Sequence, residues 1–474
     1  MNNLDQLTNP YLPSWEYIPD GEPYVFGDRV YVYGSHDYFG GDVYCMGDYM
    51  GWSAPVTDLG SWRCEGVIYR KDQDPDNEDL QGNLYAPDVT VGPDGRYYLY
   101  YVLSSKGYVS VAVSDRPEGP FAYYGNVRYP DGTRLGEREG DEPQFDPGVL
   151  TEGDRTYLYT GFCGYGDMSR HGAMVTVLDT DMLTVLEGPR FVAPGVMYCE
   201  GTGYEGHAFF EAPSIRKRGD LYYFIYSSIQ FHELCYATST CPTEGFVYRG
   251  VIISACDMGI DTYKPSEKPM YYTANNHGSM TEIGGEWYIF YHRHTNGTNY
   301  SRQGCMEKLT ILEDGTILQA EITSCGGRST PLRGQGEYPA YIACHLFTDT
   351  DTVYVPWSGW MDDRFPKVTQ ICGDDGMERM SYIANMRDSA TAGFRYFDCR
   401  GVFGIAIRTK GYANGKMEIR TAWDGDVIGQ IPVGYANVWH EAETEVTVPD
   451  GINAFYFTFR GQGHLQFAGF TLKC

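Results

Sequence analysis

The feature that most constrains the fold is a phrase that recurs five times between residues 27 and 294. Each copy has a turn containing glycine, followed by a strand of alternating side chains in which tyrosine is prominent. The copies are GDRVYVYGSHD (27–37), DGRYYLYYVLSS (94–105), GDRTYLYTGF (153–162), RGDLYYFIYSSI (218–229) and GGEWYIFYHRH (284–294). Repetition on this scale indicates one structural unit used five times.

Each copy also has an ionisable residue at nearly the same distance before its turn glycine. Counting back seven residues in four copies, and eight in the fourth copy along the chain, gives Asp20, Asp88, Asp146, Glu211 and His277. These positions are 68, 58, 65 and 66 residues apart. Units of about 64 residues, each holding several short strands, are typical of β-propeller blades. Residues 1–327 are therefore predicted to form a five-bladed β-propeller, in an all-β protein.

The common phase of these five residues predicts that they lie together. In a blade the first strand is innermost, so a residue at one point on it recurs around the central channel. A single aspartate before a strand is usually a turn or cap residue. Four carboxylates and a histidine on one axis, however, destabilise the folded state through desolvation and mutual repulsion. Acid–base catalysis uses such clusters, which gives a reason for their presence. We interpret the set as functional.

The residue types narrow the chemistry. The chain has no GxSxG, GxxxxGK[ST] or HExxH motif, which leaves cleavage of a glycosidic bond or metal binding as the use of clustered carboxylates. Glycoside hydrolysis needs one protonated carboxyl group as acid and one carboxylate that activates water or attacks directly. Glu211 is the only glutamate among the five, and its longer side chain suits the acid.

Five short segments carry a resemblance to a known family. NPYLPSWEYIPDGEPYVF, YAPDV, FDPGV, EAPSI and NNHGS resemble, in order and spacing, glycoside hydrolase family 43 across roughly residues 9–325. The resemblance implies a five-bladed propeller that hydrolyses arabinose-, xylose- and sometimes galactose-containing glycans with inversion of configuration.

Roles follow from the resemblance residue by residue. Asp20 in PDGEP resembles the general base, Asp146 in FDPG the aspartate that orients the acid and raises its pKa, and Glu211 in EAPS the general acid. Asp88 in YAPD is similar to a further acidic position near the substrate. Many members have a compact Asp-Pro-Ser where this chain has PDGEP, so Glu22 competes with Asp20 for the role of base.

Further ligand-binding residues are expected around this centre. His277 in HGS resembles an axial histidine that often holds a water-coordinated calcium ion; the alternative is a buried histidine bonded to carbonyl groups. Arg302 in YSRQG is similar to an arginine at the sugar subsite, or else forms a structural ion pair. The aromatic stretch 35–52 offers Phe39 and Trp52 for stacking on sugar rings, unless both pack inside a blade.

The repeat stops before a second unit. Residues 328–339 are interpreted as a linker, and the alternating strands in 340–474 predict a jelly-roll-like β-sandwich. The region from roughly 390 to 474 resembles a family 6 carbohydrate-binding module. Trp423 and Trp439 are either a sugar platform in this domain or parts of a structural cap.

Composition excludes several partners. With 36 Lys+Arg against 63 Asp+Glu, the net charge is −27, which argues against nucleic acid or an anionic membrane as a partner. No apolar run approaches the roughly 20 residues that span a bilayer. The start of the chain lacks a signal-like apolar stretch, so a cytoplasmic protein with free thiols is expected.

The sequence thus predicts an exo-glycosidase that needs no cofactor, apart from a structural calcium ion at His277. Its expected substrates are oligosaccharides from hemicellulose with terminal β-D-xylosyl or α-L-arabinofuranosyl residues. The alternatives are exo-β-galactosidase or arabinanase activity on the same scaffold, or a non-catalytic lectin-like propeller. A retaining fructosidase or sialidase is disfavoured, because Arg-Asp-Pro and SxDxGxTW motifs are absent.

Overall fold

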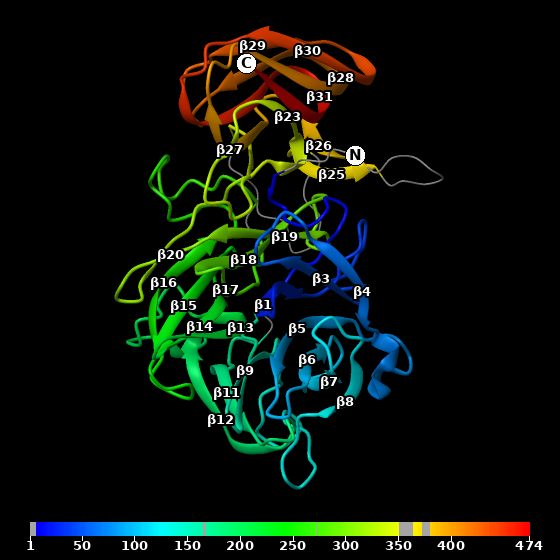
Figure 1. Cartoon of the computed structure of the whole chain (residues 1–474), viewed down its shortest axis with the longest axis vertical. Helices are drawn as coiled ribbons and strands as arrows, with labels where there is room; N and C mark the ends of the chain where they lie inside the picture. Colours follow the sequence, from blue (N-terminus) through cyan, green and yellow to red (C-terminus); the bar gives the residue numbers. More distant parts are fainter. Residues whose placement is uncertain (1–5, 165–166, 273, 350–363, 372–379) are drawn as a thin grey trace.

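The computed structural model describes residues 6–164, 167–272, 274–349, 364–371 and 380–474. These residues form two domains stacked along the long axis of the molecule, a propeller and a smaller all-β domain (Figure 1). Helix is confined to four single turns in the described part of the chain: η1 (Lys71–Gln73), η2 (Pro75–Asn77), η3 (Val196–Tyr198) and η4 (Ala340–Ile342). None of the helices in these ranges has the length and apolar character that crossing a membrane requires.

The predicted five-bladed propeller is confirmed. Four blades are antiparallel four-stranded sheets in simple chain order, and the fifth has three strands. The first blade holds β1 (Glu22–Phe26), β2 (Arg29–Tyr33), β3 (Tyr49–Pro55) and β4 (Arg63–Tyr69), and the second β5 (Leu84–Val91), β6 (Tyr97–Leu103), β7 (Ser110–Ser114) and β8 (Ala122–Asn126). The third holds β9 (Gly148–Glu152), β10 (Arg155–Thr160), β11 (Gly172–Leu178) and β12 (Val185–Pro194). The fourth holds β13 (Phe209–Arg218), β14 (Leu221–Ser228), β15 (Glu233–Ser239) and β16 (Val247–Ser254), and the fifth β17 (Met280–Ile283), β18 (Glu286–His294) and β19 (Arg302–Lys308).

The ring closes between the first and last blades. Gly21 and Gly278 form a parallel bridge, so the innermost strands of these blades lie side by side. The N-terminal segment runs along β19, where the Tyr11 backbone N–H donates to the Gly304 carbonyl and the Asn9 side chain bonds to Met306. An irregular segment from the start of the chain is thus fastened to the last blade, which helps to hold the five blades in a closed ring.

The tyrosines of the repeated phrase build the core between blades. Their alternation puts one set of rings on each face of a blade, and neighbouring blades bury both sets. Tyr33, Tyr69 and Tyr101 are almost fully buried between the first two blades. Their hydroxyl groups form hydrogen bonds, and the one between Tyr69 and Tyr101 is 2.7 Å long. Tyrosine suits this position because the ring fills apolar space while the hydroxyl bonds to neighbouring polar atoms.

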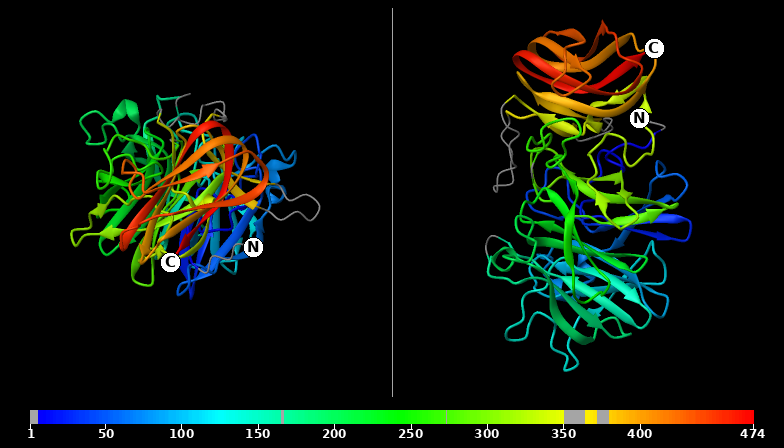
Figure 2. Two further views of the ribbon diagram at one scale, coloured as in Figure 1. Left: turned by 90° about the horizontal axis from the view of Figure 1, so that it is seen from above. Right: turned by 90° about the vertical axis from the view of Figure 1, so that its left-hand side faces the viewer.

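The second domain is all-β, but its strands share one hydrogen-bonded network. Two of them, β28 (Gly404–Arg420) and β31 (Gly451–Lys473), are long and pair with each other over most of their length. They curve around the apolar core of the domain and carry the network from one layer to the other (Figure 2). The other strands are β22 (Leu332–Arg333), β23 (Gly336–Pro339), β24 (His345–Phe347), β25 (Lys367–Ile371), β26 (Met380–Met386), β27 (Thr391–Cys399), β29 (Gly429–Val433) and β30 (Ala436–Glu445).

The segment interpreted as a linker is part of this network. Within 328–339, β22 pairs with β27 and β23 pairs with β31. A short two-stranded sheet, β20 (Thr310–Ile311) with β21 (Ile317–Leu318), precedes it.

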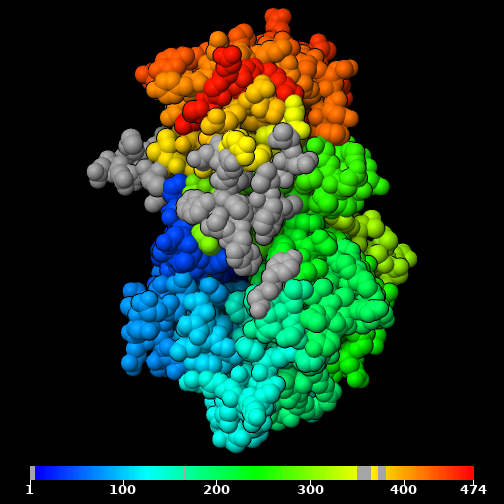
Figure 3. Space-filling model, turned by 180° about the vertical axis from the view of Figure 1, so that it is seen from behind, coloured from blue at the N-terminus to red at the C-terminus, as the bar shows by residue number. Residues whose placement is uncertain are grey.

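The two domains share one apolar core and a buried polar interface, and Figure 3 shows them in direct contact. Arg395 of β27 is 1% exposed and reaches into the propeller, where its guanidinium bonds to Glu321 and lies 3.5 Å from Asp257. In the other direction, Arg293 of β18 donates to the carbonyl groups of Tyr341 and Ala343. The second domain is therefore built onto the propeller rather than tethered to it.

Candidate active site

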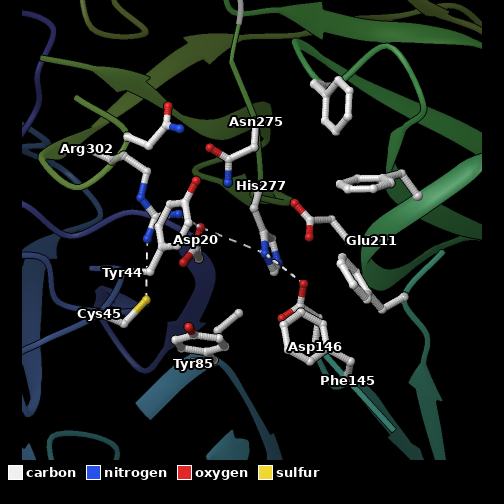
Figure 4. Close-up of a pocket in the computed structure, with 15 residues that line it drawn as sticks. Asp20, Tyr44, Cys45, Tyr85, Phe145, Asp146, Glu211, Asn275, His277 and Arg302 are labelled. Carbon is white, nitrogen blue, oxygen red and sulfur yellow. Dashed lines mark hydrogen bonds and ion pairs between the residues drawn. The ribbon is translucent and has the colours of Figure 1, made fainter. Parts of the chain in front are cut away.

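A pocket of about 330 Å³ opens where the innermost strands of the propeller begin (Figure 4). All five blades contribute to its wall, as a site on the propeller axis requires. The lining residues are Asp20, Tyr44, Cys45, Tyr85, Ala86, Phe145, Asp146, Phe162, Phe210, Glu211, Phe231, Asn275, His277, Asn299 and Arg302. The structure thus brings Asp20, Asp146, Glu211, His277 and Arg302 together, although they are spread over 283 positions of the chain.

The backbone turns sharply at the same place in three blades. Asp20, Asp146 and Ala212 have φ values of 59°, 46° and 62°. The left-handed region is unusual for residues other than glycine, and such conformations gather at functional sites. Here the turn just before or within the innermost strand directs Asp20, Asp146 and Glu211 into the pocket.

Asp20 is held as a carboxylate. It is 4% exposed, and its Oδ1 lies 2.9 Å from Arg302 Nη1 and 3.4 Å from His292 Nδ1. Burial alone would raise the pKa of Asp20, but the positive charge of Arg302 outweighs it and holds that pKa well below its usual range. The Asp37 carboxylate accepts two hydrogen bonds from the same guanidinium, at 2.8 and 3.0 Å, so Arg302 stays fixed beside Asp20.

Glu211 has the opposite electrostatic environment. Burial raises its pKa to about 8, with a further contribution from the negative charge of Asp20. Burial and the charges of Glu211 and Asp20 likewise raise the pKa of Asp146, whose Oδ2 accepts a hydrogen bond from the Ala212 backbone N–H at 3.2 Å. The pocket therefore contains Asp20 as an ionised carboxylate beside two carboxyl groups whose pKa values are raised. Because Asp146 and Glu211 interact, they lose their protons in two steps that belong to the pair.

A pair of buried histidines supports the acid through Asn275. His294 Nε2 lies 2.8 Å from Asn275 Oδ1, and His292 Nε2 lies 2.9 Å from the Asn275 carbonyl oxygen. The Nε2 atoms of His294 and His292 both act as donors here, because they face oxygen atoms of Asn275. The amide N–H group of Asn275 is then left to donate to Glu211. The sequence analysis did not find Asn275, although the signal was present: it stands two residues before His277 in NNHGS.

Asp88 lies outside the pocket. Its carboxylate is fully buried one step further down the channel, where it accepts hydrogen bonds of 2.7 Å from the Tyr24 hydroxyl and from the Val149 backbone N–H. The predicted contact of Asp88 with substrate does not fit this placement. Ala86 lines the pocket in the second blade instead.

The length of one turn explains the displacement. Four of the counted glycines, such as Gly27, are the first residue of a two-residue turn. Gly95 is instead the third residue of a longer turn, which is closed by a hydrogen bond from the Gly92 N–H to the Arg96 carbonyl. The same count back from Gly95 therefore stops two residues short of Ala86 and reaches a different level of the channel.

The stretch 35–52 reaches the pocket through Tyr44 and Cys45, not through Phe39 and Trp52. Trp52 is 3% exposed and packs in the core between the first and last blades, so it cannot stack on a sugar. Phe39 is half-buried and packs beside Tyr17, with ring centroids 6.2 Å apart. The blade-packing alternative describes Trp52 correctly.

The aromatic wall comes from residues that the sequence analysis missed. Five rings follow one another around the pocket, with successive centroids 4.7–5.8 Å apart: Tyr85, Phe145, Phe162, Phe210 and Phe231. Three of them stand directly before Ala86, Asp146 and Glu211 in sequence. The aromatic residue before the axial position is thus a repeated signal, and it provides the apolar surface that a sugar ring packs against.

Below the pocket, the channel contains its own cation. Arg216 is buried, and its Nη2 lies 2.6 Å from Glu22 Oε2, which also accepts a hydrogen bond from the Ser214 hydroxyl at 3.0 Å. The guanidinium carbon lies 4.3 Å from the centre of the Tyr24 ring. Glu22, the competing candidate for the base, is therefore 1% exposed, engaged in an ion pair and absent from the pocket wall.

The charged oxygen atoms beside His277 are too few to bind a calcium ion directly, and an ion held there through water stays a prediction. Calcium takes six to eight oxygen ligands. His277 Nδ1 faces Asp20 at 3.9 Å and Asp146 at 3.8 Å, but Asp20 is paired with Arg302. Arg216 already neutralises the carboxylate at the next level. Burial lowers the pKa of His277 to about 4, so the imidazole is neutral and separates the two aspartates.

This arrangement predicts that removal of calcium has no effect. We expect chelator-treated protein to keep its kcat/KM and its midpoint of thermal unfolding, because Arg216 supplies the positive charge in the channel. Both quantities would be measured with and without added calcium. A gain of activity on adding calcium would contradict the assignment of this role to Arg216.

Known proteins resemble this chain in sequence and in fold. The model of a family described as glycosyl hydrolases family 43 matches residues 19–317. A xylosidase/arabinosidase from Thermoclostridium stercorarium is 64% identical over 468 residues, which cover 98% of this chain and 99% of that protein. The crystal structure of a GH43_1 enzyme from Xanthomonas citri complexed with xylose is 25% identical with a TM-score of 0.54, covering 66% of this chain and 93% of the other.

A fourth likeness extends over both domains. An arabinoxylan arabinofuranohydrolase from Bacillus subtilis, solved in complex with cellotetraose, covers 98% of this chain and 97% of its own, with a TM-score of 0.52. Its 20% identity shows a shared fold.

Proposed function

Because the chain belongs to glycosyl hydrolases family 43 and is a glycoside hydrolase, we propose that it removes terminal β-D-xylosyl or α-L-arabinofuranosyl residues from hemicellulose-derived oligosaccharides with inversion. The observation that carries the proposal is the opposite shift of two pKa values in one pocket, downwards for Asp20 and upwards for Glu211. Groups arranged in this way are suited to act as base and acid in one reaction. The 64% identical relative bears the name xylosidase/arabinosidase.

In the proposed reaction, both carboxyl groups act in a single displacement. A water molecule attacks the anomeric carbon while Asp20 takes its proton, and the bond to the leaving oxygen breaks as Glu211 donates its proton to that oxygen. Arg302 keeps Asp20 ionised before the reaction, and Asn275 holds the carboxyl group of Glu211. The role of Asp146 as the residue that raises the pKa of the acid stays a prediction, supported by its place beside Glu211 in the pocket.

A lectin-like role would require every channel carboxylate to be locked in an ion pair. Burial raises the pKa of both Glu22 and Glu211 to about 8, but Glu22 is paired with Arg216 below the pocket, whereas Glu211 faces the pocket. This difference favours catalysis over simple binding.

Proton NMR of the reaction tests the proposal. 4-Nitrophenyl β-D-xyloside and 4-nitrophenyl α-L-arabinofuranoside would be followed from the first minutes. We expect α-xylose to appear first from the xyloside, because inversion converts the β-configuration. First release of the β-anomer would contradict inversion. If neither glycoside is cleaved, the xylosidase/arabinosidase assignment is wrong, and galactosides and arabinan become the substrates to try.

The pH dependence of kcat/KM follows from the two carboxyl groups. Glu211 must be protonated, so we expect activity to decline as pH rises through about 8. Asp20 must be ionised, and since its pKa is held low, no acidic decline is expected above about pH 4. The measurement is kcat/KM on an aryl-free xylo-oligosaccharide from pH 4 to 10. A decline centred between pH 5 and 6 would contradict the raised pKa of Glu211.

The second domain is proposed to support the pocket. Its strand β25 accepts a hydrogen bond of 2.6 Å from the Asn296 backbone N–H at the Val368 carbonyl, and Thr369 donates to the Asn296 side chain at 2.9 Å. Asn296 lies in the loop that carries Asn299 of the pocket wall and leads to Arg302.

The likeness of this domain to a family 6 carbohydrate-binding module stays a prediction. Its two candidate tryptophans each have a lysine ammonium over the ring: Lys268 over Trp423 at 5.3 Å and Lys410 over Trp439 at 4.6 Å. Trp423 also packs beside the cluster that joins the two domains. These contacts favour the structural cap over a shared sugar platform.

A cytoplasmic location is likewise proposed, and the state of the thiols supports it. Every cysteine in the described residues is free, and most of them are buried. Free thiols in such number are typical of a reducing compartment.

A further inference from the structure

Three side chains of different metal-binding types meet in the fourth blade, outside the pocket. They are His207, two residues before β13, and Glu233 and Cys235 at the start of β15 (Figure 1). His207 Nδ1 lies 2.6 Å from Glu233 Oε1, and Cys235 Sγ lies 3.4 Å from that oxygen and 4.0 Å from the His207 nitrogen. In the part of the chain that the structure describes, no other group of three such side chains brings its ligand atoms within 4.8 Å of one another.

One ion can reach all three atoms without a large movement. Zinc binds nitrogen and oxygen at about 2.0–2.2 Å and thiolate sulfur at about 2.3 Å. In a tetrahedral site such bonds put the ligand atoms about 3.4 Å apart for nitrogen with oxygen and about 3.6 Å apart for pairs that include sulfur. The observed separations are 2.6, 3.4 and 4.0 Å, so binding needs the His207–Glu233 pair to open by less than about 1 Å as the ion replaces their hydrogen bond. They place the ion to one side of the three atoms and leave a fourth position open.

Neighbouring groups hold the ligands in place, as in established metal sites. The Ser228 hydroxyl donates to Glu233, and the Tyr248 ring stacks on the His207 imidazole with centroids 5.1 Å apart and planes 14° apart. Glu233 and Cys235 are buried, whereas the His207 side chain is 34% exposed. The buried ligands are thus shielded from competing solvent, and the exposed histidine provides an entry path.

A histidine–glutamate ion pair can form without a thiol beside it. The chain contains such a pair for comparison: His171 and Glu142 lie 2.5 Å apart at an exposed position, and no third metal-ligating group joins them within the same limits. In the fourth blade, the cysteine completes a nitrogen, oxygen and sulfur set. This mixture suits zinc and related first-row ions rather than magnesium or calcium.

We propose that His207, Glu233 and Cys235 bind a zinc ion, with a water molecule as the fourth ligand. Binding releases the thiol proton of Cys235 and the proton shared by His207 and Glu233, so that all three offer lone pairs to the metal. The net charge of −27 favours attraction of a divalent cation.

The proposed ligands lie close in sequence to residues of the pocket wall. Phe231 stands two residues before Glu233, and Glu211 stands four residues after His207. An ion here stabilises the fourth blade and takes no part in hydrolysis, because its ligands do not line the pocket. The proposal is therefore independent of the substrate and mechanism proposed above.

Cobalt titration of the chelator-treated full-length protein tests the site. We expect one equivalent of Co²⁺ to produce a near-ultraviolet thiolate-to-cobalt band together with the visible bands of a tetrahedral ion. Zinc should abolish both and raise the midpoint of thermal unfolding by a few degrees. Cys235→Ser should remove the thiolate band, and His207→Gln should weaken binding by more than about 10- to 100-fold, which is the effect of losing an outer-shell partner.

Two matched variants separate this site from others. His171→Gln alters the comparison pair, and Cys241→Ser removes a partly exposed thiol in the same blade, so both should bind cobalt as the unmodified protein does. A thiolate band that survives in Cys235→Ser would overturn the proposal, as would the absence of any tetrahedral cobalt signal. If the buried Cys235→Ser variant does not fold, unchanged cobalt affinity in His207→Gln would overturn it equally.

Discussion

Replacing Asp20 by asparagine is expected to lower kcat/KM by about 10³- to 10⁴-fold, because the attacking water loses its base. The folded structure should change little, since Arg302 keeps its two bonds to Asp37. Binding of a substrate analogue should persist for the same reason. The measurements are initial rates on xylobiose and on an arabinofuranosyl oligosaccharide, with the midpoint of thermal unfolding as a check on folding.

The informative control is Glu22→Gln, two residues further along the chain at the start of β1. Glu22 is outside the pocket and balances the charge of Arg216, so its substitution should reduce stability while most of kcat/KM remains. The reverse pattern, with activity lost in Glu22→Gln and retained in Asp20→Asn, would make Glu22 the base. The depth of the two carboxylates in the channel distinguishes them, although both belong to the motif PDGEP.

The sequence predicts the propeller and its central carboxylates well, because both depend on a periodic signal. A hydrophobic strand after a short turn is a local pattern, and five copies of it leave few folds open. The level of each side chain in the channel is harder to predict, since one longer turn at Gly95 moves the count by two residues. Asp146 and Glu211 lie where they are expected because their blades have two-residue turns.

Interactions between distant segments are the part that sequence periodicity does not contain. Arg302 is fixed by Asp37, 265 residues earlier, and this pair decides the ionisation of Asp20. No local pattern connects the two residues. The same limit applies to the second domain: its strands are predictable from alternation, but the length of β31 and its pairing with β23, β26, β27 and β28 are not.

The choice of aromatic residues shows a further limit. The aromatic and glycine content of the stretch 35–52 indicates ligand contact, and Tyr44 of that stretch does line the pocket. Trp52, one of two candidates for stacking on a sugar, faces the space between blades, as alternation along β3 allows. Position relative to the axial residue, as for Phe145 and Phe210, is the better guide to the wall of this site.

The second large effect is expected for Glu211→Gln, and its size should depend on the leaving group. An alkoxide leaves poorly without a proton, so kcat/KM on xylobiose should fall by about 10³- to 10⁴-fold. 4-Nitrophenolate needs little protonation, and the loss on 4-nitrophenyl β-D-xyloside should be at least tenfold smaller. The decline of activity near pH 8 should also disappear in the variant, because Glu211 is the group that loses its proton there.

Glu205→Gln is the matched control, since Glu205 is exposed, stands six residues earlier and does not line the pocket. It should behave as the unmodified protein does on both substrates. An equal loss on xylobiose and on the nitrophenyl glycoside in Glu211→Gln would mean that the side chain positions the sugar and donates no proton. In that case Asp146, whose pKa is also raised, would be the carboxyl group of the pocket left to act as the acid.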